Sequence, residues 1–175
     1  MRWLVLLLIP LIIMGCVQEE YREEKTIQIK SVFENNGMIP KKYTCDGEDV
    51  SPPLFIENIS KDAKSIAIIV EDPDANYFTH WVIYNIPPTN EIPENIPKKK
   101  VIEKPFRAMQ GKNDFGYYGY GGPCPPSGTH RYYFEVFVLD TVLEEKEYTK
   151  DELLNAMKGH VIQKGILVGL YKRQP

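Results

Sequence analysis

The chain is poor in the residues that most often hold metal ions. Among its 175 residues there are three histidines and three cysteines, and neither type recurs at the short spacings of zinc or iron–sulfur sites. Asp72, Asp74, His80 and His130 could act as ligands by type, but their positions follow no ligand spacing. We therefore expect no metal and no other cofactor.

An excess of charge of either sign is also missing. The chain has 21 basic and 24 acidic residues, for a formal net charge of -3, without long runs of one sign. This balance excludes the basic surface that binds nucleic acid, so we expect no nucleic-acid partner. There is no internal repeat, and no alternation of strands and helices that would predict an α/β nucleotide-binding fold. The length fits one domain.

A long apolar run occurs at the N-terminus alone. Residues 3–14 are apolar and follow Arg2, but a membrane-spanning helix needs roughly 20 such residues. The run instead matches the apolar region of a secretion signal. Because residues 13–16 (IMGC) resemble a lipobox, we expect residues 1–15 to be a signal peptide and Cys16 to be lipidated. Cleavage at another position, or an uncleaved anchor, is the alternative.

These features predict the domain limits and the location. Residues 16–25 form a lipidated, polar tether, and residues 26–175 form the folded domain. The protein is expected at the cell membrane, lipid-anchored on the extracytoplasmic face. In that oxidising environment Cys45 and Cys124 either form a disulfide or remain two free thiols, and the sequence leaves both alternatives open.

The pattern of the domain is mainly that of β-strands. Alternating or β-branched stretches predict strands at residues 26–33, 65–72, 79–86, 131–140 and 164–171. The prolines and glycines between them mark turns. One helix is expected at residues 150–158, because Thr149 and Glu152 form a capping box and Gly159 ends the segment. We expect this helix to flank an antiparallel sheet.

Polar residues gather at the ends of three predicted strands. Asp72 ends one strand and His80 begins the next, where a period of two would direct His80 and Trp81 to opposite faces. His130 and Tyr132 are two residues apart and therefore share a face. Taken singly, Asp72 is better explained as a turn cap and His80 as a structural histidine.

Four motifs in order carry a family resemblance: YTCDGEDVSPPL, DPDAN, THWVIYNIP and YGGPCPPSGTHRYYF. Together they resemble the phosphatidylethanolamine-binding, or Raf kinase inhibitor-like, proteins, in the compact bacterial and archaeal branch. The resemblance covers about residues 29–171. It implies an antiparallel β-sandwich with Greek-key connections and a few short helices. It also implies a small pocket for anions, phosphate esters or phospholipid headgroups.

The resemblance assigns the pocket to particular residues. Asp72 is the acid, and the loop of residues 122–126 is the wall. The chain departs from the common DPDAP motif at Asn76, which leaves the shape of the following loop in doubt. The ligand-binding residues implied by the resemblance are Asp72, His80, Gly122, Cys124, Pro125, His130 and Tyr132.

Such a pocket has a predictable chemistry. His80, His130 and Tyr132 could each donate a hydrogen bond to a phosphate, and amides of the glycine-rich loop could add more. The prolines donate nothing. Because a carboxylate at Asp72 repels a dianion, we expect binding to tighten as pH falls through the histidine range, near pH 6.5.

Other functions are weighed against binding. Relatives in the family restrain kinases or serine proteases, which makes inhibition of a protease through the pocket rim the alternative function. Ser127, His130 and Asp72 could form a hydrolytic triad on paper, but the segment lacks a nucleophile elbow, so we expect no enzymatic activity. Compact relatives often form homodimers. The natural ligand, the partner and the oligomeric state are left open by the sequence.

Overall fold

The computed structural model describes residues 25–173, which form two β-sheets, one α-helix and two short 3-10 helices. The large sheet has eight strands in the order β1-β11-β10-β5-β6-β9-β8, with β3 also paired to β11. The small sheet has the order β2-β4-β7. The predicted mainly β fold is confirmed. The strands of the large sheet are β1 (Lys25–Thr26), β3 (Gly37–Met38), β5 (Ser65–Asp72), β6 (Phe78–Ile86), β8 (Val101–Ile102), β9 (Ala108–Gln110), β10 (His130–Leu139) and β11 (Val161–Tyr171). Those of the small sheet are β2 (Gln28–Lys30), β4 (Leu54–Glu57) and β7 (Glu91–Ile92).

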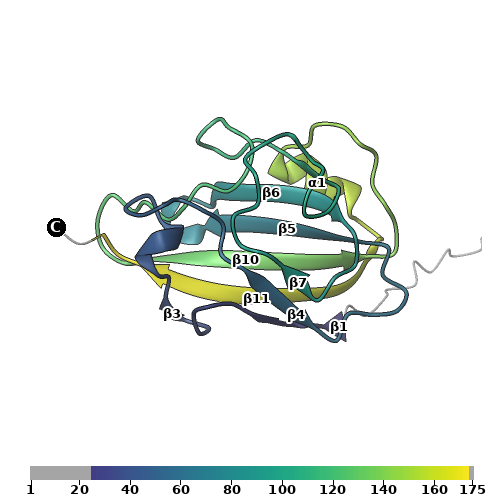
Figure 1. The fold of residues 1–175 in the computed structure, drawn as a ribbon, viewed down its shortest axis with the longest axis horizontal. Helices are drawn as coiled ribbons and strands as arrows, with labels where there is room; N and C mark the ends of the chain where they lie inside the picture. The colour runs from purple at the N-terminus through teal and green to yellow at the C-terminus, as the bar shows by residue number, and fades with distance from the viewer. Residues whose placement is uncertain (1–24, 174–175) are drawn as a thin grey trace, which may run out of the picture.

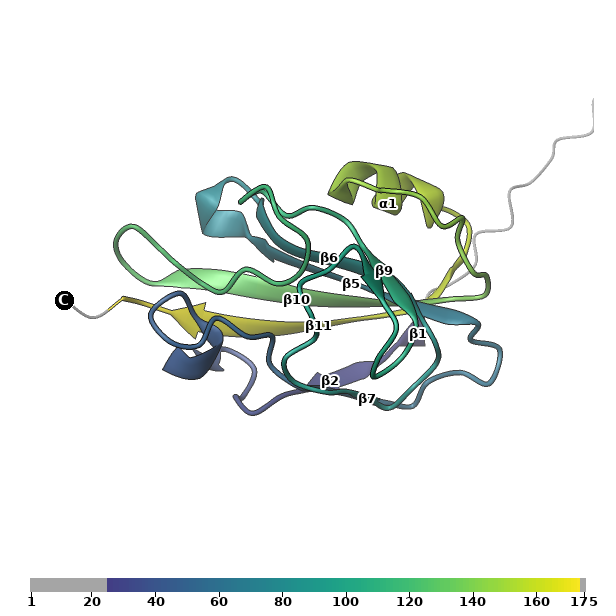
Figure 2. The ribbon, with the colours of Figure 1, turned by 45° about the horizontal axis from the view of Figure 1, so that its top comes forward.

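The large sheet is covered on both faces (Figure 2). An inner core lies between the two sheets, and an outer core lies beneath helix α1 (Lys150–Ala156). Strand β5 is buried along its whole length, as expected of an isoleucine-rich strand that has a core on either side. The inner core includes Ile29, Leu54, Ile56, Ile66, Ile68, Trp81, Tyr120, Tyr132 and Phe134, and the outer core includes Ala67, Ile69, Val82, Tyr84, Leu153 and Met157.

Helix α1 begins at the predicted capping box. The Thr149 side chain accepts a hydrogen bond from the Glu152 amide, and the Glu152 side chain accepts one from the Thr149 amide. Leu153 and Met157 are buried in the outer core. The helix therefore flanks the sheet, as predicted, although its last α-helical residue is Ala156 and not Lys158.

The connectivity of four strands is a Greek key. Strands β5, β6 and β9 are neighbours, and β10 returns to pair with β5 on its other side. The return connection, residues 111–129, lies at the end of the sheet where β5 ends and β6 and β10 begin (Figure 1). This arrangement brings the ends of three strands and one long loop to the same place.

The prediction of a single strand at residues 26–33 is wrong in extent. Strand β1 pairs with β11 in the large sheet, whereas β2 pairs with β4 in the small sheet. Ile27 lies between them and is buried. The chain thus changes sheets within three residues, because one apolar segment serves both layers of the inner core.

Two features of the sequence concern anchoring and cross-linking. The expected signal peptide, residues 1–15, and the expected lipidation site, Cys16, lie outside the described residues. Within residues 25–173, no helix has the length and apolar character needed to cross a membrane.

Cys45 and Cys124 form a disulfide, with Cα atoms 5.4 Å apart.

Candidate functional site

Asp72 is held by the turn that follows β5. It is the N-cap of the 3-10 helix η2 (Pro73–Ala75), and its Oδ1 accepts hydrogen bonds from the amides of Asp74, at 2.9 Å, and Ala75, at 3.1 Å. Its Oδ2 accepts a hydrogen bond from His130 Nδ1 at 2.7 Å. Only 3% of Asp72 is exposed. The carboxylate is therefore both a turn cap and a fixed acceptor for His130.

Asp74, the second acid of the motif, has a different role. It forms an ion pair with Arg131 of β10, with 2.7 Å between Oδ1 and Nη2, and also accepts a hydrogen bond from the Arg131 amide. These bonds lower the pKa of Asp74 to about 2. The pair fastens η2 to β10 and so holds Asp72 beside His130.

His80 lies at a bulge in β6. Val70 pairs with Trp81 and Glu71 pairs with Thr79, so His80 is the extra residue. The ring of His80 packs at 5.2 Å from that of Tyr132, whose side chain belongs to the same inner core as Trp81. The predicted alternation of His80 and Trp81 is therefore wrong, because the bulge directs both side chains to the same side of the sheet.

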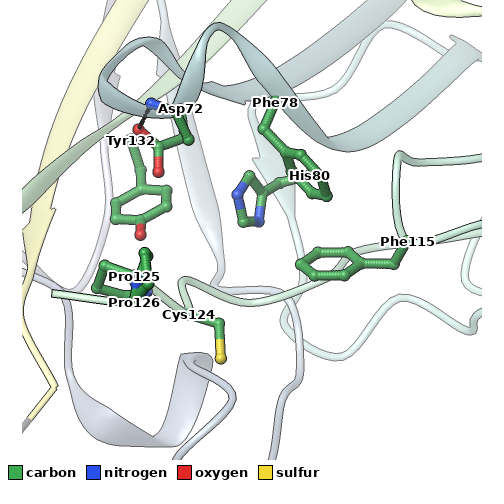
Figure 3. A pocket seen from close by; sticks show the side chains of 9 residues that line it. Asp72, Phe78, His80, Phe115, Cys124, Pro125, Pro126 and Tyr132 are labelled. Carbon is green, nitrogen blue, oxygen red and sulfur yellow. Dashed lines mark hydrogen bonds between the residues drawn. The ribbon is translucent and has the colours of Figure 1, made fainter.

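The hydrogen bonds of His80 fix its role. Nδ1 lies 2.7 Å from the Gly121 carbonyl oxygen, which can only accept, so Nδ1 carries a proton. Burial lowers the pKa of His80, which favours the neutral ring. The other nitrogen, Nε2, is then an acceptor. In Figure 3 the His80 ring faces the space that separates it from Asp72 and Tyr132.

The Tyr132 hydroxyl is buried and has no hydrogen-bond partner among the described residues. It lies close to the Asp72 carboxylate and the Cys124 amide, but in hydrogen-bonding geometry with neither. Burial, followed by the charge of Asp72, raises the pKa of Tyr132, so the phenol keeps its proton. Native proteins rarely leave a buried hydroxyl without a partner.

These groups surround a cavity of about 200 Å³. Its walls are mainly apolar side chains from β6, from η2 and from the loop between β9 and β10 (Figure 3). The lining residues are Asp72, Ala75, Phe78, His80, Phe115, Cys124, Pro125, Pro126 and Tyr132.

Two of the predicted site residues do not line this cavity. The Gly122 amide donates a hydrogen bond to Asp49 at 2.6 Å, and a Cβ at Gly122 would lie 2.7 Å from the Thr44 Cα. Gly122 therefore allows the loop to pack closely against the backbone at Thr44, because it has no Cβ. His130 does not line the cavity, and it can influence a ligand there through its hydrogen bond to the Asp72 carboxylate.

The loop supplies shape, and two of its amides are already used within the protein. Gly121 donates its amide hydrogen to the His80 carbonyl at 2.8 Å, and Gly122 donates to Asp49. The amides of Gly121 and Gly122 are thus not free to bind a phosphate. The expected donor roles of the histidines also change, because each Nδ1–H has a partner and each Nε2 donates only when the ring is protonated.

Sequence reasoning missed two aromatic walls of the cavity. Phe78 and Phe115 pack edge to face, with ring centroids 4.8 Å apart, and both contact the His80 ring. Phe78 begins β6 one residue earlier than predicted. Phe115 lies in a glycine-rich loop that has no periodic pattern, so its only signal was an apolar residue among turn residues.

The residues named for a metal site and for a hydrolytic triad can be compared with the geometry. Within residues 25–173, no three His, Cys, Asp or Glu side chains gather as a metal site requires. Asp72 and His130 are bonded as in a catalytic triad, but Ser127 does not line the cavity and has no hydrogen bond to His130 in the part of the chain that the structure describes.

Comparison with known proteins agrees with the fold. Residues 29–172 match the family model described as phosphatidylethanolamine-binding protein. A UPF0098 protein of Archaeoglobus fulgidus is 55% identical over 89% of this chain, which spans 54% of that relative's length. A UPF0098 protein of Pyrococcus abyssi is 54% identical, with 99% of this chain and all of the relative covered.

Solved structures extend the likeness to three dimensions. A phosphatidylethanolamine-binding protein homolog of Chlamydia trachomatis superposes with a TM-score of 0.77 at 39% identity, and covers 86% of this chain and 100% of its own. Escherichia coli YbcL, described as a member of the mammalian family, gives 0.75 at 28% identity, with 85% and 99% covered. The fold and cavity define a compact β-sandwich binding protein, and the chain belongs to the phosphatidylethanolamine-binding protein family.

Proposed function

We propose that the cavity binds a small phosphate ester or related anion, including the headgroup type found in phospholipids. The observation that carries this proposal is the buried Tyr132 hydroxyl, which has no hydrogen-bond partner among residues 25–173, while the His80 ring, with its Nε2 lone pair, faces the same cavity. A ligand that both accepts and donates would satisfy the two groups.

A monoprotonated phosphate ester has this combination. One oxygen can accept from Tyr132, and its P–OH can donate to the neutral His80. The charge of Asp72 is partly offset by two amides and His130, which reduces the repulsion of an anion. Because the Tyr132 hydroxyl is buried, the contact requires a small displacement of Pro125 or Pro126, toward which the hydroxyl points in Figure 3.

Titration with phosphoethanolamine, observed by NMR of the His80 imidazole, tests the proposal. We expect a saturable shift of the His80 signals, with a dissociation constant of about 1 mM or tighter, which corresponds to roughly 4 kcal/mol. The exposed His160, which contacts Asp140, should not shift. Equal small shifts at both histidines would indicate nonspecific ionic effects and contradict a site.

We further propose that the protein is lipid-anchored at Cys16 on the extracytoplasmic face of the membrane. The position of Lys25 shows at which end of the domain the proposed anchor would join. Lys25 pairs with Gln163, which pairs with Val138, whereas Tyr132 pairs with Gly169. Six residues of strand, or roughly 20 Å, separate the two levels, and β1 lies at the end of the large sheet opposite the end where β10 begins (Figure 1).

The anchor is tested by fractionation. We expect a Cys16→Ser variant to leave the membrane fraction and the natural protein to carry a lipid on Cys16 by mass spectrometry. A membrane-free natural protein would contradict anchoring without affecting the ligand site.

Inhibition of a serine protease through the rim of the cavity is the alternative function, and we propose no catalytic activity. The two functions are separable. An inhibitor lowers the activity of trypsin-like, chymotrypsin-like or elastase-like proteases in stoichiometric amounts, whereas a binding protein leaves all three unchanged.

A further inference from the structure

The loop of residues 113–119, next to the cavity, is organised around the buried side-chain amide of Asn113. Asn113 is 3% exposed, and its Oδ1 accepts hydrogen bonds from the amides of Phe115, at 3.1 Å, and Tyr117, at 3.3 Å. Its Nδ2 donates to the Gly119 carbonyl at 2.9 Å. The loop therefore has a fixed conformation, because its backbone groups are satisfied from within.

This fixed loop presents two aromatic rings to solvent. Phe115 is 43% exposed and Tyr117 is 37% exposed, and their ring planes are 17° apart with centroids at 5.8 Å. We call this pair the aromatic ledge. A Cβ at Gly121 would lie 2.6 Å from the Phe115 ring and 2.8 Å from the Tyr117 hydroxyl oxygen. Glycine at position 121 thus lets both rings lie close to the backbone.

The aromatic ledge is continuous with the cavity. Phe115 lines the cavity and packs against the His80 ring, with centroids 5.3 Å apart. Tyr117 extends the same surface outward, and Lys98 Nζ lies 5.4 Å from its ring centroid. Leaving two apolar rings exposed on a rigid loop gains nothing for folding, whereas such rings bind flat groups with little loss of conformational entropy.

We propose that the aromatic ledge holds the ester group of the ligand, which is then an aromatic phosphate monoester. The inference rests on the proposed function, because the phosphate must occupy the cavity for its substituent to reach Phe115. Offset stacking on the ledge adds to the binding of the phosphate. The same surface gives a methyl or ethanolamine ester much less contact, since neither has an aromatic face.

Calorimetric titration of methyl phosphate and phenyl phosphate tests the proposal. For the natural protein we expect phenyl phosphate to bind roughly 3- to 10-fold more tightly, the range that an aromatic pair supplies. Tyr117→Ala and Phe115→Leu should reduce this ratio toward one, while methyl phosphate binds Tyr117→Ala within about twofold of its natural affinity. Tyr118→Ala is the matched control, because Tyr118 adjoins the ledge in sequence but bonds to Glu147 instead, and it should keep the full ratio.

The outcomes separate the two proposals. If methyl phosphate binds but the phenyl-to-methyl ratio is near one, or is unchanged in both ledge variants, the ledge has no role and the phosphate site stands. If neither ester binds the natural protein, the phosphate site fails and the ledge proposal fails with it. Cyclohexyl phosphate binding as tightly as phenyl phosphate would show apolar contact without stacking and would overturn the aromatic specificity.

Discussion

Tyr132 of β10 and His80 of β6, two strands on either side of β5, face one cavity, with ring centroids 5.2 Å apart and ring planes nearly perpendicular. Within residues 25–173, each has one polar atom without a hydrogen-bond partner: the Tyr132 hydroxyl, and the Nε2 of a His80 ring whose Nδ1 is bonded to Gly121. The first is a donor, and the second is an acceptor while the ring is neutral. The cavity therefore suits a ligand that can both accept and donate a hydrogen bond.

Replacing Tyr132 with phenylalanine should separate stability from binding. The variant removes a buried hydroxyl without a partner, so we expect the free energy of unfolding to stay equal or rise by up to about 1 kcal/mol. Phosphoethanolamine should bind about 10-fold more weakly, as loss of one hydrogen bond to a charged group predicts. Urea denaturation and calorimetry measure the two effects.

Tyr118→Phe is the matched control for that substitution. It removes a hydroxyl that bonds to Glu147 at the surface, so phosphoethanolamine affinity should not change. A Tyr132→Phe variant that binds as tightly as the natural protein would show that the hydroxyl does not contact the ligand.

Binding of sulfate should keep tightening as pH falls below about 6, where binding of a phosphate ester levels off. Burial lowers the pKa of His80 in the free protein, and a bound anion raises it again, so binding takes up a proton and tightens as pH falls. Sulfate has no proton to donate to neutral Nε2, whereas a phosphate ester has one near pH 6. Titrations at several pH values between about 5 and 8 measure both slopes.

A His80→Asn variant tests whether His80 is the group that makes sulfate binding depend on pH. Asparagine can still donate to the Gly121 carbonyl, but it has no titrating nitrogen, so the sulfate slope should flatten. His160→Asn is the control and should keep the slope. In the absence of ligand, the lowered pKa of His80 also means that stability is full above the unfolded pKa, near 6.5, and declines as pH falls below it.

The disulfide should contribute strongly to stability. It closes a segment with a sequence separation of 79 residues, for which loop-closure entropy predicts about 4 kcal/mol. We expect the Cys45→Ser/Cys124→Ser variant to lose that much in urea denaturation. Ligand affinity should fall less, because Cys45 still donates its amide hydrogen to the Pro123 carbonyl and Gly122 remains bonded to Asp49. A loss below about 1 kcal/mol would contradict the entropic account.

Asp74→Asn should loosen the turn that positions Asp72. The pKa of Asp74 is lowered to about 2 by Arg131, so the stabilisation from this carboxylate is complete above the unfolded pKa, near 3.9, and disappears as pH falls through about 2. The difference in melting temperature between the natural protein and the variant should therefore shrink over that range. Phosphoethanolamine should also bind more weakly at pH 7.

A second arginine pair provides the control for Asp74→Asn. Glu145 bonds to Arg107 at 2.7 Å on an exposed surface, and neither residue lines the cavity. Glu145→Gln should leave phosphoethanolamine affinity unchanged. Equal effects of the two variants on affinity would show that Asp74 acts through general surface charge and not through the turn.

Much of the architecture could be predicted from local patterns. Strand β5 was predicted with its observed limits, and the Thr149–Glu152 capping box correctly located the start of α1. The short strands β4, β7, β8 and β9 were not predicted. Their segments are only two to four residues long, so their pairing depends on neighbours distant in sequence and not on a pattern of their own.

The candidate site was also predictable in part. The motifs indicated Asp72, His80, Cys124, Pro125 and Tyr132, which the fold brings to one cavity. They could not indicate that Gly122 faces Thr44, or that His130 stands behind Asp72.

The sequence by itself determined the β-rich class, the capped helix and the residue types of the site, because these depend on side-chain period, local hydrogen bonds and order along the chain. The tertiary structure alone decided that a bulge turns His80 toward Tyr132, that Gly121 fixes the proton of His80 on Nδ1, and that Phe115 joins the cavity wall. The reason is physical. Strand register and hydrogen-bond partners are set between segments far apart in the chain, and no local pattern records them.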